Sequence, residues 1–167
     1  MSDAFWKFSL VQSLETSVAS SPVFNVYLAA QVRIGDKGFL SKNIKVNDLI
    51  DHHGDIHHIF PKNYLQKKGL SRKDYNQIAN YVLMQSEINV RIRDQAPVVY
   101  FSELKEQANN GGLKYGGIEN MTELLENLKA NCIPADIFVM DIEDYPDFLK
   151  KRRILMAQRI RDYYFSL

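Results

Sequence analysis

A cluster of histidines near the middle of the chain limits the possible structures most. All four histidines of the 167-residue chain fall between positions 52 and 58, as His52, His53, His57 and His58. Histidine titrates near neutral pH and is the commonest metal ligand. Two asparagines follow in the same stretch, on either side of a short β-prone run, YVLM. We therefore expect residues 51–97 to build a polar site around which the rest of the chain folds.

Length and composition indicate one globular domain. The chain has 46% apolar and 25% charged residues, which are ordinary values for a folded protein, and 167 residues suffice for one core. A net charge of +1 does not indicate a nucleic-acid binder, so any such function depends on local patches. The single cysteine, Cys132, fits a reducing compartment. With no leader-like or membrane-spanning segment, we expect a soluble cytoplasmic protein and no membrane partner.

Within residues 51–97 the pattern predicts a strand, a long connection, a second strand and a helix. A strand is expected over residues 55–60, because Pro61 follows it directly. The connection contains helical segments at 62–69 and 71–79, and the second strand covers 81–84. Ser86 then caps a helix that ends near residue 93, before Pro97.

Helices are expected on both sides of this central stretch. Before it, helices cover 4–15 and 22–34, the latter between Ser21-Pro22 and Gly35. After it, helices cover 98–108, a segment capped by Asn120, and a final segment from residue 144. The predicted fold is α+β and mostly helical, a single domain with helical flanks at 1–50 and 98–167.

The two adjacent histidines suggest a division of labour at a phosphate. Side chains of neighbouring strand residues point to opposite faces, so His57 and His58 do not easily bind one ion together. One can hold a metal while the other faces an attacking water, as phosphodiester hydrolysis requires. Asn89, near the start of the following helix, could supply a second oxygen ligand.

The runs DIHHIFP and NYVLMQSEIN resemble the HNH endonuclease motif, with its ββα-metal fold of a two-stranded hairpin and a helix. More specifically, residues 47–101 are similar to the C-terminal nuclease domain of GmrSD-type modification-dependent restriction enzymes. The resemblance implies that His57 and Asn89 are metal ligands and that His58 is the general base. It places Asn80 at the middle position of the motif, where its amide ties the long connection to the second strand.

The resemblance also implies an activity and partners. It implies a metal-dependent DNA endonuclease of a restriction or defence system, leaving a 5′-phosphate and a 3′-hydroxyl. The ion is Mg²⁺ or Mn²⁺, although Zn²⁺ or Ni²⁺ also suits an imidazole ligand. Lys62, Arg91 and Arg93 are placed to meet backbone phosphates. The family's larger N-terminal part, with its DGQQR-type motif, is absent from this sequence, so we expect a separate or missing recognition and NTP-dependent part.

Two other functions fit the same residues. The chain could be a non-catalytic DNA-binding or assembly module that retains the HNH fold. It could also be an α-rich interaction domain in which the histidine cluster is incidental. Metal-dependent nicking of plasmid DNA separates the first of these from a nuclease, and metal-dependent thermal stabilisation separates the second.

Several further groups have an ordinary structural interpretation. His52 and His53 are expected in a solvated turn before Gly54, and the KKRR run at 150–153 on a solvated helix face. Lys67, Lys68, Arg72 and Lys73 could guide DNA or belong to a solvated face. The aromatic residues at the two ends are expected in the core rather than on a base-stacking surface; they are Phe5, Trp6, Phe8, Tyr163, Tyr164 and Phe165.

Overall fold

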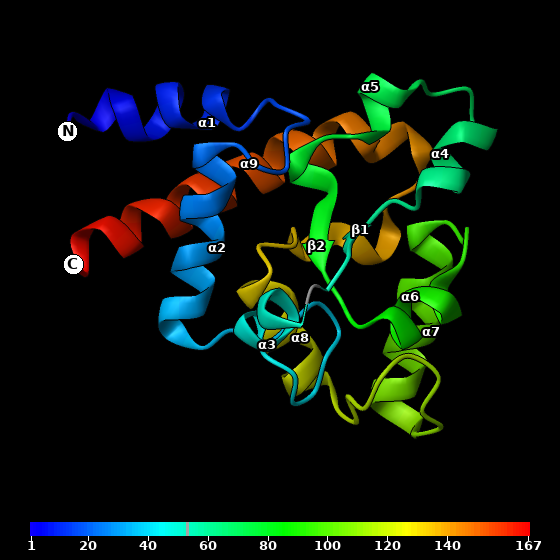
Figure 1. Cartoon of the computed structure of the whole chain (residues 1–167). Helices are drawn as coiled ribbons and strands as arrows, with labels where there is room; N and C mark the ends of the chain where they lie inside the picture. The colour runs from blue at the N-terminus through cyan, green and yellow to red at the C-terminus, as the bar shows by residue number, and fades with distance from the viewer. Residues whose placement is uncertain (53) are drawn as a thin grey trace.

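The computed structural model describes residues 1–52 and 54–167, which form a mostly helical α+β structure around one short sheet (Figure 1). The α-helices are α1 (Leu10–Ser13), α2 (Pro22–Ile34), α3 (Val46–Asp51), α4 (Lys62–Lys67), α5 (Arg72–Tyr75), α6 (Ser86–Ile92), α7 (Pro97–Asn110), α8 (Met121–Ala130) and α9 (Tyr145–Phe165). A π-helix (Phe5–Ser9) precedes α1, and 3₁₀ helices cover Ile78–Asn80, Ala135–Val139 and Ile142–Asp144. The strands are β1 (Ile56–His58) and β2 (Tyr81–Leu83), an antiparallel pair.

Local capping signals explain why the flanking helices begin and end where they do. Helix α2 has Pro22 in its first turn and ends at Gly35, whose φ of 72° is a left-handed conformation that glycine adopts without steric cost. The side chain of Asn120 accepts a hydrogen bond from the Glu123 amide at the start of α8. The predicted helix at 22–34 and the predicted cap of α8 are therefore confirmed.

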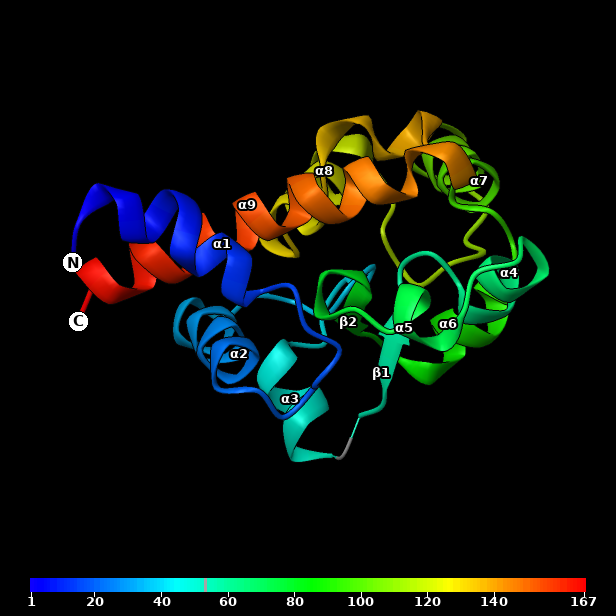
Figure 2. The same ribbon diagram turned by 90° about the horizontal axis from the view of Figure 1, so that it is seen from above.

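The last helix, α9, runs along the whole length of the molecule. It packs against α1 and α2, and its other end lies beside α5, where the Tyr145 hydroxyl donates to the Asp74 carbonyl oxygen at 2.7 Å (Figure 1). Leu149, Met156 and Ile160 are buried on one side of it, as their spacing predicts. The two ends of the chain lie side by side, because α1 and the end of α9 pack together (Figure 2).

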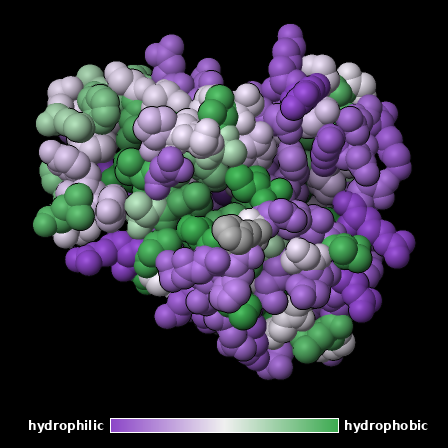
Figure 3. Space-filling model, viewed as in Figure 1, coloured by the Kyte–Doolittle hydropathy of each residue, from purple (hydrophilic) through white to green (hydrophobic). Residues whose placement is uncertain are grey.

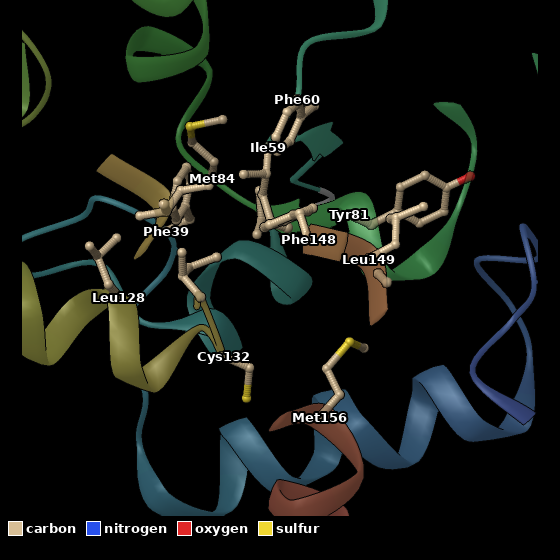
Figure 4. Packing of buried hydrophobic residues seen from close by; sticks show 14 of the residues in the cluster. Phe39, Ile59, Phe60, Tyr81, Met84, Leu128, Cys132, Phe148, Leu149 and Met156 are labelled. Atoms are coloured by element: carbon tan, nitrogen blue, oxygen red, sulfur yellow. The ribbon is translucent and has the colours of Figure 1, made fainter. Parts of the chain in front are cut away.

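One hydrophobic core joins all three parts of the chain. Ile59 and Phe60 follow β1 directly and point into it, together with Leu128 of α8 and Phe148 of α9 (Figure 4). The core therefore draws on residues from 1–50, 51–97 and 98–167. Among the helices built from residues 1–52 and 54–167, none combines the length and the apolar character needed to cross a bilayer.

The expectation that the KKRR run at 150–153 lies on a solvated face is wrong for Arg152, and Arg153 is half-buried as well. The side chain of Arg152 is only 1% exposed. Its guanidinium donates hydrogen bonds to the carbonyl oxygens of Ala79 (2.9 Å), Tyr81 (2.7 Å) and Asn131 (3.2 and 3.3 Å). Four of its five N–H groups are thus used on backbone carbonyls, which offsets the cost of burying the charge. Arg152 fixes the chain on both sides of Asn80.

The expectation that the terminal aromatic residues belong to the core is only partly met. Trp6 is buried, with its ring centroid 5.2 Å from that of Tyr164 and 5.7 Å from that of Phe165. Phe8 and Phe165, however, are mostly exposed. The two helices that carry these rings meet at one end of the molecule, where too little chain surrounds them to cover both sides.

Candidate active site

In the β1–β2 pair, each of the two predicted site histidines lies opposite a residue of the other strand. In the antiparallel register His57 faces Val82, and His58 faces Tyr81. The pairing continues beyond the strand, where the Ile59 amide donates to the Asn80 carbonyl at 2.9 Å. The predicted order of strand, connection with helices, strand and helix is observed, since α6 follows β2 after two residues. Figures 1 and 2 show α6 beside the strand pair.

Asn80 is fully buried, and its carboxamide joins the end of β1 to the connection. Its Oδ1 accepts from the Phe60 amide at 2.8 Å. Its Nδ2 donates to the carbonyl oxygens of Phe60 (3.0 Å) and Tyr75 (3.3 Å). The bond to Tyr75 ties the connection to the residue before β2, and the two bonds to Phe60 tie that residue to the end of β1. Asn80 touches only backbone, so its role here is to position the strand that carries His58.

His58 is held by a side chain that the sequence analysis did not identify. Its Nε2 lies 3.0 Å from Oδ1 of Asn76, at the end of α5. Because a carboxamide oxygen only accepts, Nε2 carries the proton, and Nδ1 is left with a free lone pair. The ring also packs against Tyr81 and Tyr75, at centroid distances of 5.3 and 6.3 Å. The imidazole thus has a fixed tautomer and a defined orientation.

The surroundings of His58 favour its neutral form. Partial burial lowers its pKa from the usual value of a histidine, and the positive charges of Lys62 and His57 act in the same direction. The hydrogen bond to Asn76 opposes the shift but does not cancel it. A neutral imidazole with an unprotonated Nδ1 at neutral pH is the form that a general base requires.

His57 is half-buried, and its ring is less satisfied by hydrogen bonds than the ring of His58. Burial lowers its pKa, and the negative charge of Asp55 opposes that change. Its Nε2 is buried and has no hydrogen-bond partner among the residues that the structure describes. An imidazole nitrogen without a partner in the interior is uncommon and calls for an explanation, such as a ligand that binds there.

Asn89 is half-buried in α6, and within residues 1–52 and 54–167 its side chain forms no hydrogen bond. It is therefore available as a ligand on the helix that follows β2 in the chain. In the described part of the chain, no group of three or more His, Cys, Asp or Glu side chains comes together at one place. The expected pair of His57 and Asn89 is smaller and contains a carboxamide, so that observation does not bear on it.

The other predicted contact residues are exposed. Lys62 lies with its Nζ 5.7 Å from the centroid of the Tyr75 ring, next to the His58 ring. Arg91 and Arg93 are exposed in and just after α6. His52 is exposed at the end of α3, where its Nδ1 lies 2.8 Å from the Asp48 carbonyl oxygen, as expected for a solvated turn. The same expectation for His53 lies outside the described residues.

Two residues that shape the site were missed, and each for a clear reason. Asn76 lies within an irregular connection, where asparagine is a common turn residue and carries no special signal. Arg152 contacts Ala79 and Tyr81 across more than seventy positions of sequence, and it stands in a run of four basic residues that resembles a solvated face. No periodicity in the sequence relates either of them to the histidines.

Comparison with known proteins gives little additional information about the site. No family model matches the chain, and no solved structure matches it. A stretch of 98 residues, 59% of the chain, is 32% identical to an uncharacterized protein of Methanocaldococcus jannaschii. The matched stretch spans only 16% of that protein's length. The geometry of the residues around His57 and His58 is therefore the main guide to function.

Proposed function

We propose that the chain is a metal-dependent DNA endonuclease domain of the HNH type, which hydrolyses phosphodiester bonds with a single metal ion. The observation that carries the proposal is the hydrogen bond between His58 and Asn76, because it fixes the imidazole with Nδ1 as an acceptor. The strand–strand–helix order and the bonds of Asn80 support the same assignment. We also propose that the strand pair and α6 form an HNH core, that the chemistry depends on a metal ion, and that the chain belongs to a restriction or defence system.

In the proposed reaction, Nδ1 of His58 takes a proton from a water molecule, whose oxygen attacks the phosphorus atom. The bond from phosphorus to the 3′ oxygen breaks, and that oxygen takes a proton from solvent water, which leaves a 5′-phosphate and a 3′-hydroxyl. The lowered pKa of His58 keeps the base unprotonated at neutral pH. Asn76 prevents rotation of the ring and so keeps Nδ1 directed at the water.

His57 and Asn89 are the residues that would hold the ion. An imidazole nitrogen and a carboxamide oxygen are suitable donors, and the unpartnered Nε2 of His57 fits a site that binds a ligand there. When bound, Mg²⁺ or Mn²⁺ stabilises negative charge on the phosphate and on the departing oxygen, and Zn²⁺ or Ni²⁺ is compatible with the imidazole. Lys62, Arg91 and Arg93 are assigned to DNA phosphates, and recognition of a particular sequence is assigned to a separate part of the system.

The alternative is a DNA-binding or assembly module without catalysis. The observation in its favour is that the proposed ligand pair contains no carboxylate. Hard cations such as Mg²⁺ bind proteins mainly through charged oxygen ligands, so neutral ligands alone hold them weakly.

Nicking of supercoiled plasmid in Mg²⁺ or Mn²⁺ tests the proposal. We expect His58→Ala to lower the rate by about 10²–10⁴-fold without unfolding the chain, the usual contribution of a positioned base. His52→Ala is the matched control, since His52 is exposed at the end of α3, and it should cleave like the parent. Equal rates for His58→Ala and the parent would contradict the assigned role.

Asn89→Ala tests the metal site separately. The variant should need a higher metal concentration for half-maximal cleavage and should cleave more slowly at saturation. An unchanged metal titration would remove Asn89 from the proposed ligand pair.

A further inference from the structure

Positive charge is concentrated in residues 62–93, the segment that follows the histidines and contains Asn89. Residues 62–93 contain seven basic and two acidic residues, a net charge of +5, whereas the whole chain has a net charge of +1. The remaining residues therefore have a net charge of −4. The nearly neutral total conceals a strongly basic region next to His58.

All seven basic side chains of this segment are exposed, and they lie on three neighbouring helices. We call this set the basic face; it consists of Lys62, Lys67 and Lys68 on and just after α4, Arg72 and Lys73 on α5, and Arg91 and Arg93 on and just after α6. An ion pair between Lys67 and Asp94 joins the end of α4 to the end of α6. Figure 3 shows that the side of the molecule over α4 and α5 is largely hydrophilic.

Acidic side chains do little to neutralise this face. Among the described residues, only Lys67 of the seven has a carboxylate within ion-pair distance. Asp74 uses its carboxylate at the start of α5, where the Ser71 amide and hydroxyl donate to it at 2.8 and 2.6 Å. The face therefore carries an excess of positive charge, although Asp94 lies close to Lys67 and Arg93 and Asp141 lies close to Lys68, and this excess attracts a polyanion.

The face connects directly to His58. Lys62 lies beside the ring of Tyr75, which packs against His58, and Asn76, which binds His58, follows α5 immediately. A polyanion bound along the face would therefore pass next to the proposed general base.

The face offers no exposed aromatic ring. Its aromatic residues are Tyr64, Tyr75 and Tyr81, and all three are buried, with Lys62 and Lys68 lying near two of the rings. Proteins that bind unpaired strands stack the bases on exposed aromatic side chains, whereas contacts to a duplex backbone need only cations and polar groups. Exposed aromatic side chains lie at the other end of the molecule: Phe8 in the π-helix before α1, and Tyr164 and Phe165 in α9.

We infer that the basic face is the surface that binds the phosphate backbone of double-stranded DNA, and that duplex rather than single-stranded DNA is the substrate form. This inference rests on the proposed function for its link to cleavage. A groove of about 650 Å³ beyond α5 borders the basic face at Lys73, but Glu15 and Asp74 also line it, so we place the bound backbone along the exposed helices and not in this groove.

Fluorescence anisotropy with a labelled duplex and the corresponding single strand tests the inference, using the full chain in excess EDTA so that cleavage does not interfere. The test variant is the triple substitution Lys68→Gln, Arg72→Gln and Lys73→Gln. The matched control is Lys7→Gln, Lys105→Gln and Lys129→Gln, which removes the same charge from exposed positions on other elements.

We expect the parent to bind the duplex more tightly than the single strand. The test triple should bind duplex at least about tenfold more weakly, with a slope of log affinity against log salt reduced by about three. The control triple should behave like the parent. The inference is overturned if the test triple keeps the parent's affinity and slope, if both triples weaken binding equally, or if the single strand binds as tightly as the duplex.

The two proposals can fail separately. Duplex binding that depends on the basic face, without His58-dependent cleavage in any metal, would support the surface and contradict the nuclease. Cleavage that depends on His58 but is unaffected by the test triple would support the nuclease and contradict the basic face as the DNA-binding surface.

Discussion

Buried carboxamides close loops in two regions of the molecule, around the strand pair and around α7 and α8. In the helical region, Asn127 holds residues 38–41 through the Leu40 amide (2.8 Å) and the carbonyl oxygens of Gly38 (3.0 Å) and Ser41 (3.1 Å). In the strand region, Asn80 makes three bonds of the same kind, to Phe60 and Tyr75.

The two regions differ in the groups that their side-chain amides bind. Around α7 and α8, Gln107 and Asn127 bind the backbone of loops. Around the strands, Asn76 binds the imidazole of His58, which is an ionisable side chain. A side-chain amide that binds backbone groups therefore has a structural role, because it closes a loop. An amide indicates a catalytic site only where it orients an ionisable side chain. The following substitutions test that distinction.

Arg152→Met should have the largest effect on stability. The substitution leaves the carbonyl oxygens of Ala79, Tyr81 and Asn131 without their hydrogen-bond donor. Each unsatisfied buried oxygen costs about 1–3 kcal/mol, and part of this cost is offset because a charge is no longer buried. We expect the free energy of unfolding to fall by about 3 kcal/mol or more. Denaturant unfolding measures it, and Arg161→Met, at the partly exposed end of α9, serves as control. Equal losses for the two variants would show that Arg152 does not fix the strand region.

Asn80→Ala and Asn127→Ala compare the two regions directly. Asn80→Ala removes three buried hydrogen bonds and Asn127→Ala removes four, the longest of them the 3.5 Å bond from Asn131, so each should lower the free energy of unfolding by about 2–3 kcal/mol. Only Asn80→Ala should also lower the cleavage rate, because it alone loosens the strand that carries His58. The rate is compared at a temperature where both variants are folded by circular dichroism. Equal loss of cleavage in the two variants would mean that stability alone explains the effect.

Asn76→Asp should produce a smaller but more specific change in the pH dependence. In the parent, burial lowers the pKa of His58, so the acid limb of the pH–rate profile should lie below about pH 6.5. A carboxylate in place of the amide favours imidazolium and should move that limb upward by about 1–3 pH units. Asn76→Ala removes a bond that raises the pKa, so its limb should move downward while the rate falls. Unshifted profiles in both variants would show that Asn76 does not contact the base.

The same lowered pKa values have a consequence for stability. Both His57 and His58 bind a proton less readily in the folded chain than in the unfolded chain. Below about pH 6.5 the unfolded chain therefore binds more protons, and stability falls as the pH falls through the folded-state pKa values. In a variant with both His57→Gln and His58→Gln, the free energy of unfolding should fall less as the pH is lowered.

Features with local causes were predictable from the sequence. Helix α2 and the start of α8 follow from residues within one turn of their ends, and the strand–helix order around Asn80 follows from a short motif. Contacts between distant segments were not predictable: Arg152 looked like part of a solvated run, and Asn127 looked like an ordinary helix residue. The exposure of Phe8 and Phe165 likewise depends on how α1 and α9 meet, which neither helix encodes alone.

The central claim is that His57 and Asn89 share one cation beside the base His58. A crystal grown with Mn²⁺ and measured at a wavelength sensitive to manganese tests this most directly. The account predicts an anomalous peak bonded to the His57 imidazole and the Asn89 carboxamide oxygen, with Nδ1 of His58 facing the open side of the ion. A structure in which manganese binds elsewhere or not at all, with Asn89 directed away from His57, would contradict it.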